Sequence, residues 1–215
     1  MARESVSDKR ARAQEIVRLL KKQYPDACCS LRYKTVHQLM VATILSAQCT
    51  DERVNAVTPS LFKRYKSIKA FAEADLTELA NEIFSTGFHN SKARSIRLSA
   101  QMLVKQYGGK IPRQIDQLVK LAGVGRKTAS VILGAGFGLA EGIVVDTHVG
   151  RISRLLALTS EKDPAKVEYD LVRVIEEPDW IAYSHLIIFH GRAVCKARTP
   201  DCPACTLRDL CPSAG

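Results

Sequence analysis

Apolar residues at helical spacing, separated by helix-starting and helix-ending signals, constrain the fold of this chain more than any other feature. Thr35 with Gln38 forms a capping box before an apolar run, and Gly108-Gly109 ends a helix that opens at Asn90-Ser91. Pro59 predicts a kink or restart inside another helix. The sequence has no strand-like alternation bounded by hairpin turns and no internal repeat. It therefore predicts an all-α fold of roughly ten helices.

Basic charge is concentrated in one part of the chain. The 215 residues carry a formal net charge of +10, and residues 91–127 hold nine basic residues against one acid, a net +8. Such an excess favours a polyanion as partner, either nucleic acid or an anionic membrane. The least charged stretch, 128–145, contains four glycines, and residues 1–22 lack the apolar core of a signal peptide, so we expect nucleic acid and no membrane. For Lys92, Arg94 and Arg97, a solvated helix face is an equally good interpretation.

A glycine turn lies between two apolar segments in Leu121-Ala-Gly-Val-Gly-Arg-Lys-Thr-Ala129. Gly123 and Gly125 permit a tight backbone, and the free amides that start the next helix can donate to a phosphate oxygen. An ordinary helix–helix turn is the alternative. Because Arg126-Lys127 follows directly, we favour a DNA-binding hairpin.

Lys127 and Asp146 are the candidate chemical groups. Lys127 is either a phosphate contact or a nucleophile, since the start of a helix and the neighbouring Arg126 both favour the neutral amine, which can form a Schiff base. Asp146 follows an apolar run and precedes a helix. It fits an N-cap, and the same carboxylate could stabilise a cationic sugar intermediate or manage a proton. His148 is expected to be packed or solvent-facing.

Four of the seven cysteines lie near the end of the chain with the spacing C-x6-C-x2-C-x5-C: Cys195, Cys202, Cys205 and Cys211. Four thiolates suit either a tetrahedral zinc or a [4Fe–4S] cluster, and the residues alone do not separate the two. The pattern indicates a reducing compartment rather than a disulfide scaffold. Lys196 and Arg198 lie in the first loop of this segment, and the other three cysteines fit ordinary thiols.

Taken together, these features resemble the endonuclease III family of base-excision DNA glycosylases from about Glu15 to Cys211. Besides the cysteine spacing, the residues that carry the resemblance are Leu45-Ser-Ala-Gln-Cys-Thr-Asp51, Thr86-Gly-Phe-His-Asn-Ser-Lys-Ala93, Leu121–Ala129, Val145-Asp-Thr-His148 and His190-Gly-Arg192.

The resemblance implies two helical domains flanking a DNA-binding cleft. Residues 29–139 would form a six-helix domain with a helix-hairpin-helix, and residues 1–28 and 140–215 a discontinuous [4Fe–4S] cluster domain. It implies a monomeric, bifunctional glycosylase and AP lyase of base excision repair, acting on double-stranded DNA that contains damaged pyrimidines or abasic sites. Its expected location is the bacterial cytoplasm, in association with the nucleoid.

The resemblance also implies roles for single residues. Lys127 would attack C1′ of the sugar of a flipped nucleotide, and Asp146 would be the catalytic aspartate. Gln48 would enter the space left by the flipped base, and Phe88 would act as a wedge against the opposite strand. Further DNA contacts would come from His89, Gly123, Gly125, Arg126, Lys196 and Arg198. The [4Fe–4S] ligands would be Cys195, Cys202, Cys205 and Cys211.

The sequence departs from the family pattern at several positions. Ala122 stands where proline is usual, Phe88-His89 where Leu-Tyr is common, and Thr199 where a second basic residue is common, with the acidic Asp201 nearby. One alternative function is a non-catalytic DNA-binding module with a structural metal. Another is a mismatch or adenine glycosylase, but adenine-specific and some mismatch-specific relatives lack a lysine at the position of Lys127.

Overall fold

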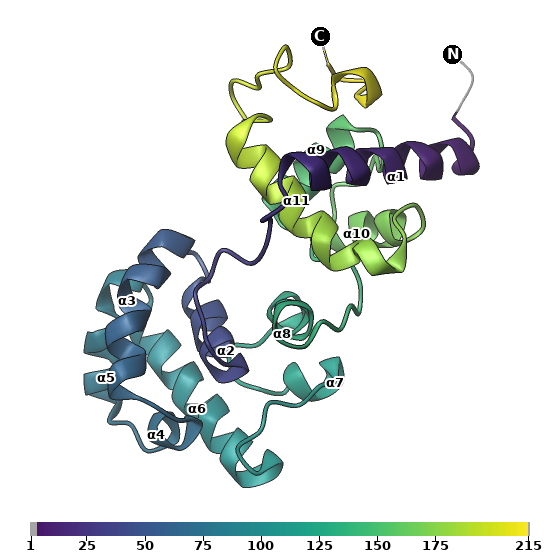
Figure 1. Ribbon diagram of the computed structural model, residues 1–215. Helices are drawn as coiled ribbons and strands as arrows, with labels where there is room; N and C mark the ends of the chain where they lie inside the picture. The colour runs from purple at the N-terminus through teal and green to yellow at the C-terminus, as the bar shows by residue number, and fades with distance from the viewer. Residues whose placement is uncertain (1–3, 215) are drawn as a thin grey trace. The chain divides into compact units, whose positions relative to one another are not determined.

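The computed structural model describes residues 4–214, and over that range the secondary structure is helical, with no strand (Figure 1). The predicted all-α class is confirmed. The chain divides into two compact units, one of residues 29–139 and one of residues 4–28 with 140–214. Each unit has its own apolar core and is described by itself.

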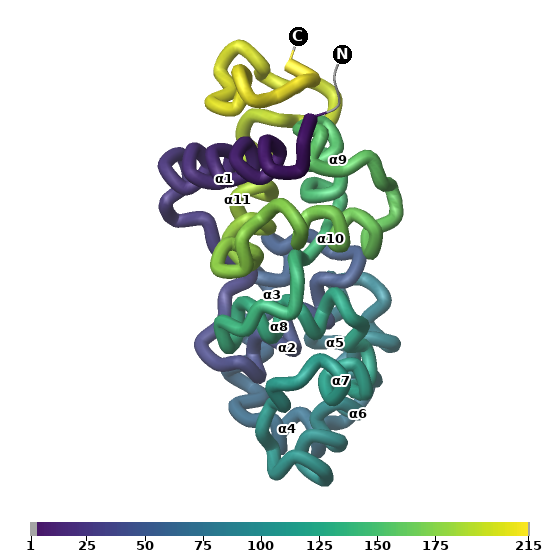
Figure 2. Tube along the Cα trace, turned by 90° about the vertical axis from the view of Figure 1, so that its right-hand side faces the viewer, coloured from purple at the N-terminus to yellow at the C-terminus, as the bar shows by residue number. Residues whose placement is uncertain are grey.

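The unit of residues 29–139 contains seven α-helices. They are α2 (Val36–Leu45), α3 (Asp51–Arg64), α4 (Ile68–Ala72), α5 (Leu76–Glu82), α6 (His89–Tyr107), α7 (Ile115–Leu118) and α8 (Arg126–Phe137). Helix α6 packs against α2, α4 and α5, and α2 lies side by side with α8 in both views (Figures 1 and 2). Residues 39–45 of α2 are all buried, so this helix runs through the middle of the unit.

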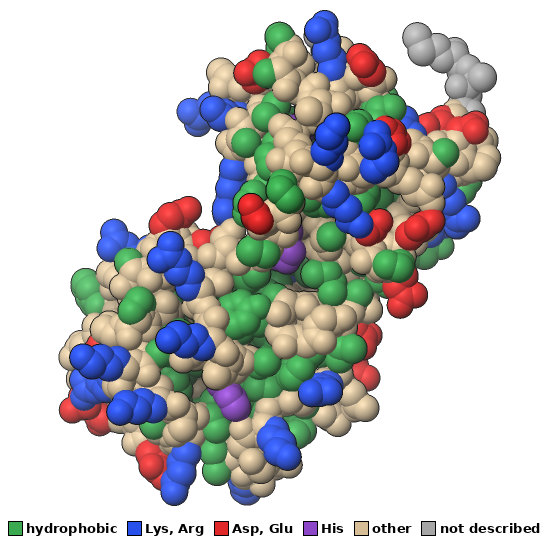
Figure 3. Space-filling view, in the orientation of Figure 1, with side chains coloured by type: hydrophobic (Ala, Val, Ile, Leu, Met, Phe, Trp, Pro, Cys, Tyr) green, Lys and Arg blue, Asp and Glu red, His purple; other side chains and the backbone are tan. Residues whose placement is uncertain are grey.

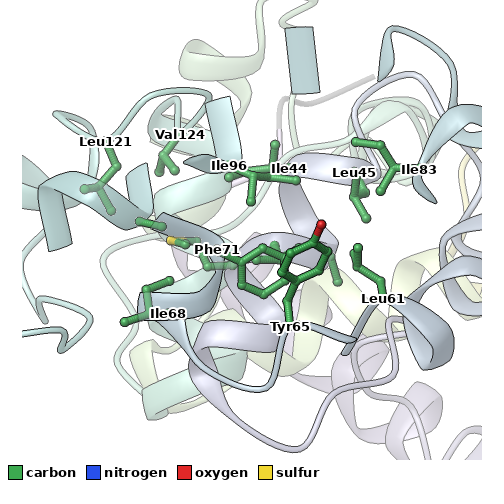
Figure 4. Close-up of a cluster of buried hydrophobic side chains, with 14 of the residues drawn as sticks. Ile44, Leu45, Leu61, Tyr65, Ile68, Phe71, Ile83, Ile96, Leu121 and Val124 are labelled. Carbon is green, nitrogen blue, oxygen red and sulfur yellow. The ribbon is translucent and has the colours of Figure 1, made fainter. Parts of the chain in front are cut away.

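The core of this unit reaches the segment between α7 and α8. Leu121 and Val124 lie in the same cluster as Ile44 of α2 and Ile96 of α6 (Figure 4). Both side chains are at most 3% exposed. Burying two such side chains is worth roughly 3–6 kcal/mol, so the segment is fixed to the domain core rather than being a free loop.

Local signals in the sequence mark several helix ends, but the start predicted at Asn90-Ser91 is wrong, because α6 begins at His89 with Phe88 as its N-cap. The Thr35 side chain accepts from the Gln38 amide at 3.3 Å at the start of α2, and Gly108, with φ +57°, ends α6. Of the kink or restart predicted at Pro59, the restart is wrong, because α3 continues through the proline from Asp51 to Arg64. Val57, Thr58 and Leu61 around the proline are buried, and this packing outweighs the cost of about 3 kcal/mol for an interior proline.

The second unit contains four α-helices: α1 (Val6–Gln23), α9 (Thr147–Leu155), α10 (Pro164–Val172) and α11 (Trp180–Ala193). Helix α11 packs against α1 and α9. Its buried Tyr183 hydroxyl lies 2.8 Å from Ser153 Oγ of α9, which satisfies both polar groups inside the core. Residues 194–214 follow as turns with one short 3-10 segment, Arg208–Leu210 (Figure 2). The buried Leu207 packs into the core of this unit and holds the segment there. None of the helices in residues 4–214 has the length and apolar character needed to cross a membrane.

Candidate active site

The turn between α7 and α8 is held tightly by α6. Gly123 has φ +75°, and a Cβ built on it would lie 2.8 Å from Cβ of Ser95, closer than packed carbon atoms approach. The hydroxyl of Ser99 donates to the carbonyl of Ala122 at 2.6 Å. Glycine is therefore required at position 123 both by backbone conformation and by packing, and the departure from proline at 122 leaves the turn intact.

Gly125 is in a different situation. It is the N-cap of α8, its φ of −80° is open to any residue, and a Cβ there would meet nothing within 4 Å. Because a glycine cap has no side chain, no cap oxygen accepts from the first amides of α8. Arg126 and Lys127 follow in the first turn, and both are exposed. Free amides, a helix dipole and two cations form a site suited to a phosphate group.

Two exposed side chains of the same unit sit on strained turns. Gln48 follows α2 with φ +53°, and Phe88 precedes α6 with φ +48°. Phe88 is 65% exposed, which is unusual for so large an apolar side chain. His89 packs its ring against that of Phe84, with the ring centroids 4.7 Å apart. A strained backbone that presents an exposed side chain is typical of a functional site.

The basic block of residues 91–127 is only partly available to a partner. Arg94 is exposed, but Lys92 is 5% exposed and Arg97 is half-buried, so the solvated helix face considered for these three residues is wrong for Lys92. Burial lowers the pKa of Lys92. The guanidinium of Arg113 lies 4.9 Å from the centre of the Phe137 ring. On the face of this unit seen in Figure 3, Lys and Arg side chains are scattered rather than gathered in one patch.

Asp146 caps helix α9 in the other unit. Its Oδ1 accepts from the Val149 amide at 2.8 Å, and the carboxylate is half-buried. The N-cap interpretation is therefore confirmed. The capping bond uses Oδ1 only, so Oδ2 can still accept a hydrogen bond or a proton. His148 is packed: a Cβ on Gly191 of α11 would lie 2.5 Å from its Nδ1, so the glycine at 191 makes room for the imidazole.

The four C-terminal cysteines line a single cavity of about 80 Å³. This is room for several water-sized groups. Burial raises the pKa of Cys205, and the negative charge of the other three cysteines adds to the effect. Within residues 4–214 no three His, Cys, Asp or Glu side chains come close enough to hold one metal ion. The four cysteines therefore line the same cavity, but their sulfur atoms are too far apart to coordinate a single metal ion.

Two residues beside this cavity had no recognised role in the sequence. Arg151 of α9 donates to the Cys195 carbonyl at 2.7 Å and reaches its Sγ at 3.7 Å. His190 of α11 has Nε2 3.6 Å from Cys205 Sγ and Nδ1 3.2 Å from the Tyr24 hydroxyl. Burial lowers the pKa of His190 to about 4, with a contribution from Arg151. His190 belongs to the segment His190-Gly-Arg192, which carries the family resemblance but gave this residue no role. No local sequence signal indicated a role for Arg151.

The predicted site residues fall into three groups. The first group lies on the two strained turns and consists of Gln48, Phe88 and His89. The second group forms the hairpin and consists of Gly123, Gly125, Arg126 and Lys127. Both groups belong to the unit of residues 29–139. The other unit carries Asp146 at the start of α9 and the cysteine segment, in which Lys196 and Arg198 are exposed.

Comparison with known proteins places this architecture in a class. Residues 41–177 match the family described as HhH-GPD superfamily base excision DNA repair protein. Endonuclease III of Synechocystis sp. is 51% identical over 97% of this chain and 95% of its own length, and endonuclease III of Bacillus subtilis is 44% identical over 87% and 86%. The chain belongs to the endonuclease III family of this superfamily. A solved non-covalent endonuclease III–DNA complex has a TM-score of 0.89 at 39% identity, covering 95% of this chain and 96% of that one.

Proposed function

We propose that this protein is a bifunctional DNA glycosylase and AP lyase of base excision repair that removes oxidised or otherwise damaged pyrimidines from duplex DNA. One observation carries the proposal furthest. The exposed Lys127 lies in the first turn of α8, two residues after the glycine cap Gly125, where the first helix amides are free to bind a phosphate. A primary amine beside a phosphate-binding backbone is placed to act on the sugar of the bound strand.

Lys127 supplies the nucleophile. Its neutral Nζ attacks C1′ of a flipped nucleotide, and the glycosidic C–N bond breaks with its electron pair leaving on the base, which takes up a proton. Loss of a proton from Nζ and opening of the sugar ring, with O4′ protonated, give an iminium between Nζ and C1′. Removal of a proton from C2′ then expels the 3′ phosphate by β-elimination. Water hydrolyses the remaining iminium and returns the free lysine.

Asp146 supplies the carboxylate. Its Oδ1 is engaged with the Val149 amide, which fixes the orientation of the side chain, and Oδ2 can stabilise positive charge on the sugar or take a proton. The N-cap bond thus positions the group for chemistry.

Gln48, Phe88 and His89 act on the duplex. Phe88 is an exposed apolar wedge on a strained turn, and such wedges unstack base steps. The exposed amide of Gln48 can hydrogen-bond to the base left unpaired once its partner has flipped. His89, stacked on Phe84, contributes to the contact with the opposite strand.

The remaining DNA contacts are to phosphates. The hairpin with Arg126 and the exposed Lys196 and Arg198 give sequence-independent, salt-sensitive binding. We infer that the protein acts as a monomer and works at the nucleoid in the bacterial cytoplasm. We also propose that the unit of residues 29–139 is the helix-hairpin-helix domain and that the other unit is the cluster domain.

Cys195, Cys202, Cys205 and Cys211 fit a [4Fe–4S] cluster. They provide four soft sulfur donors that line one cavity, which suits an iron–sulfur group. Such a cluster, when bound, supplies a cross-link that holds residues 194–214 together. Arg151 and the neutral His190 would orient Cys195 and Cys205.

Replacing one proposed cluster ligand is expected to damage this unit severely. In Cys205→Ser the purified protein should lose its bound iron and sulfide and the associated brown colour, and its thermal midpoint should fall by at least roughly 10 °C, because cluster binding is coupled to folding. Metal analysis and thermal unfolding measure both effects. Cys28→Ser, which replaces an exposed thiol outside the segment, should change neither. Stoichiometric zinc in a colourless wild-type protein would contradict the assignment.

The two glycines of the hairpin are expected to respond differently to alanine. Gly123→Ala forces a Cβ onto Ser95 at positive φ and should lower the free energy of unfolding by at least about 2 kcal/mol. Gly125→Ala has open space and an ordinary φ, so its stability should change by less than about 1 kcal/mol while affinity for duplex DNA falls several-fold. Urea unfolding and DNA titration separate the two. Full DNA affinity in Gly125→Ala would show that no ligand approaches the turn closely.

A substrate panel tests the proposed activity against its alternatives. We expect base release and strand cleavage on duplexes that contain an oxidised pyrimidine or an abasic site. Release confined to adenine opposite 8-oxoguanine, or to a mismatched thymine, would favour the mismatch class. Tight binding without any cleavage would favour a non-catalytic DNA-binding module.

A further inference from the structure

Lys92 is a buried lysine whose surroundings explain its position. It lies in the first turns of α6, is 5% exposed, and its Nζ donates to the carbonyl oxygens of Leu45 at 2.7 Å and of Thr86 at 2.8 Å. Lysine is rarely buried, because an ammonium group removed from water needs compensating acceptors. Here both acceptors are main-chain groups that belong to segments far apart in the sequence.

Each of these acceptors is the last residue of a helical segment, directly before a turn that carries an exposed side chain. Leu45 ends α2, and three residues later comes Gln48. Thr86 ends a short 3-10 segment, and two residues later comes Phe88. Lys92 therefore links the residues that precede two turns, and these two turns lie about 40 residues apart in the chain.

Both turns hold a conformation that their sequences disfavour. Gln48 and Phe88 are in the left-handed region, and among residues 4–214 only one other non-glycine residue, Ala157, has a positive φ. Side chains of this kind adopt that region at a cost, so the surrounding structure must hold them there. The two hydrogen bonds from Lys92 fix the main-chain carbonyl that directly precedes each turn.

We propose that Lys92 is a positioning residue that holds the turns carrying Gln48 and Phe88 in register for entry into the duplex. It contacts no DNA itself and acts through these two side chains. The inference rests on the proposed function, in which both side chains enter the DNA stack. A purely structural lysine would support the fold equally well but would not change how the protein distinguishes damaged from intact DNA.

The first test uses the free protein. The Cys49 amide donates to Ser46 O at 3.1 Å, so its hydrogen exchange reports opening of the turn around Gln48. The Gly87 amide donates to Phe84 O at 3.3 Å, so its exchange reports opening of the 3-10 segment that leads into Phe88. In Lys92→Met both amides should exchange at least about tenfold faster relative to the Val124 amide of the hairpin, which donates to Leu121 O. Lys63→Met, at an exposed lysine of α3, is the control. Unchanged relative rates would overturn the proposal.

The second test uses DNA. The measured quantity is the ratio of affinities for a duplex with a tetrahydrofuran abasic analogue and for the same undamaged duplex. Lys92→Met should lower this ratio at least about tenfold while affinity for undamaged duplex stays within about twofold. In a Gln48→Ala, Phe88→Ala background the same substitution should lower the ratio less than about twofold, since the side chains through which it acts are gone. An equal loss in both backgrounds, or no loss in either, would overturn the positioning role.

A conservative variant keeps both tests decisive. Lys92→Arg retains a cation with several donors, and it should lower the ratio by a smaller factor than Lys92→Met, with the loss again absent from the double-alanine background. It takes the place of Lys92→Met if that variant does not fold. Equal affinity of the wild-type protein for both duplexes would overturn the proposed function, whereas the exchange experiment would still decide whether Lys92 holds the turns.

Discussion

Lys127→Gln is expected to reduce base release and strand cleavage by at least roughly 10³-fold. Glutamine keeps most of the length of the side chain and can still donate a hydrogen bond, but its amide nitrogen is not a nucleophile. Affinity for DNA should fall only a few-fold, because the hairpin amides and Arg126 remain. Single-turnover kinetics on a duplex with an oxidised pyrimidine measure the chemical step separately from binding.

The control for this substitution is Lys63→Gln, at an exposed lysine of α3 outside the hairpin. It should leave the single-turnover rate within about twofold of the wild-type rate. If Lys127→Gln instead weakened DNA binding strongly and left the rate at saturation unchanged, Lys127 would be a phosphate contact. That result would restore the other interpretation of this residue.

Asp146→Asn is expected to slow the same chemical step by roughly 10²- to 10⁴-fold with little loss of stability. Asparagine caps a helix as well as aspartate does, so the bond to the Val149 amide is retained, and loss of the charge at the start of α9 costs at most about 1 kcal/mol. The substitution therefore separates the two roles of this carboxylate. Single-turnover rates and urea unfolding of the same preparation measure both quantities.

Asp163→Asn is the matched control. Asp163 caps α10 in the same unit and accepts from the amides of Ala165 and Lys166. Its stability change should resemble that of Asp146→Asn, and its reaction rate should equal that of the wild-type protein. Equal rates in the two variants would mean that Asp146 is only a cap.

The helical architecture could be predicted because its signals are local. Thr35 caps the start of α2 and the glycine pair 108–109 ends α6, and each acts only on the adjacent turn of its helix. Pro59 shows the limit, since its effect on α3 depends on how residues from other helices bury the turn around it. Propensity is a weak guide where tertiary packing decides.

Lys92 lies on the buried side of α6, where a charged residue is not expected. The buried residues Ile96, Ala100 and Leu103 form a stripe, and one turn back along the same stripe lies Lys92. The spacing therefore indicated a buried position, but the lysine side chain favoured solvent. The two carbonyl acceptors, Thr86 six residues away and Leu45 forty-seven residues away, explain why the burial is tolerated.

The candidate site was predictable where a motif is contiguous. The hairpin, the acid at 146 and the cysteine spacing each lie within one short segment. Arg151 could not be assigned in this way, because its partner Cys195 is 44 residues away and no local pattern links the two. The left-handed conformation of Phe88 likewise depends on contacts from outside its own turn.

The most direct test of the proposed mechanism is to trap its covalent intermediate. The wild-type protein is mixed with a duplex containing an abasic site or an oxidised pyrimidine, the iminium is reduced with borohydride, and the adduct is mapped by mass spectrometry of its peptides. The mechanism predicts one stable protein–DNA adduct, joined at Lys127. An adduct at another amine, or no adduct from a folded, DNA-binding protein, would contradict the mechanism.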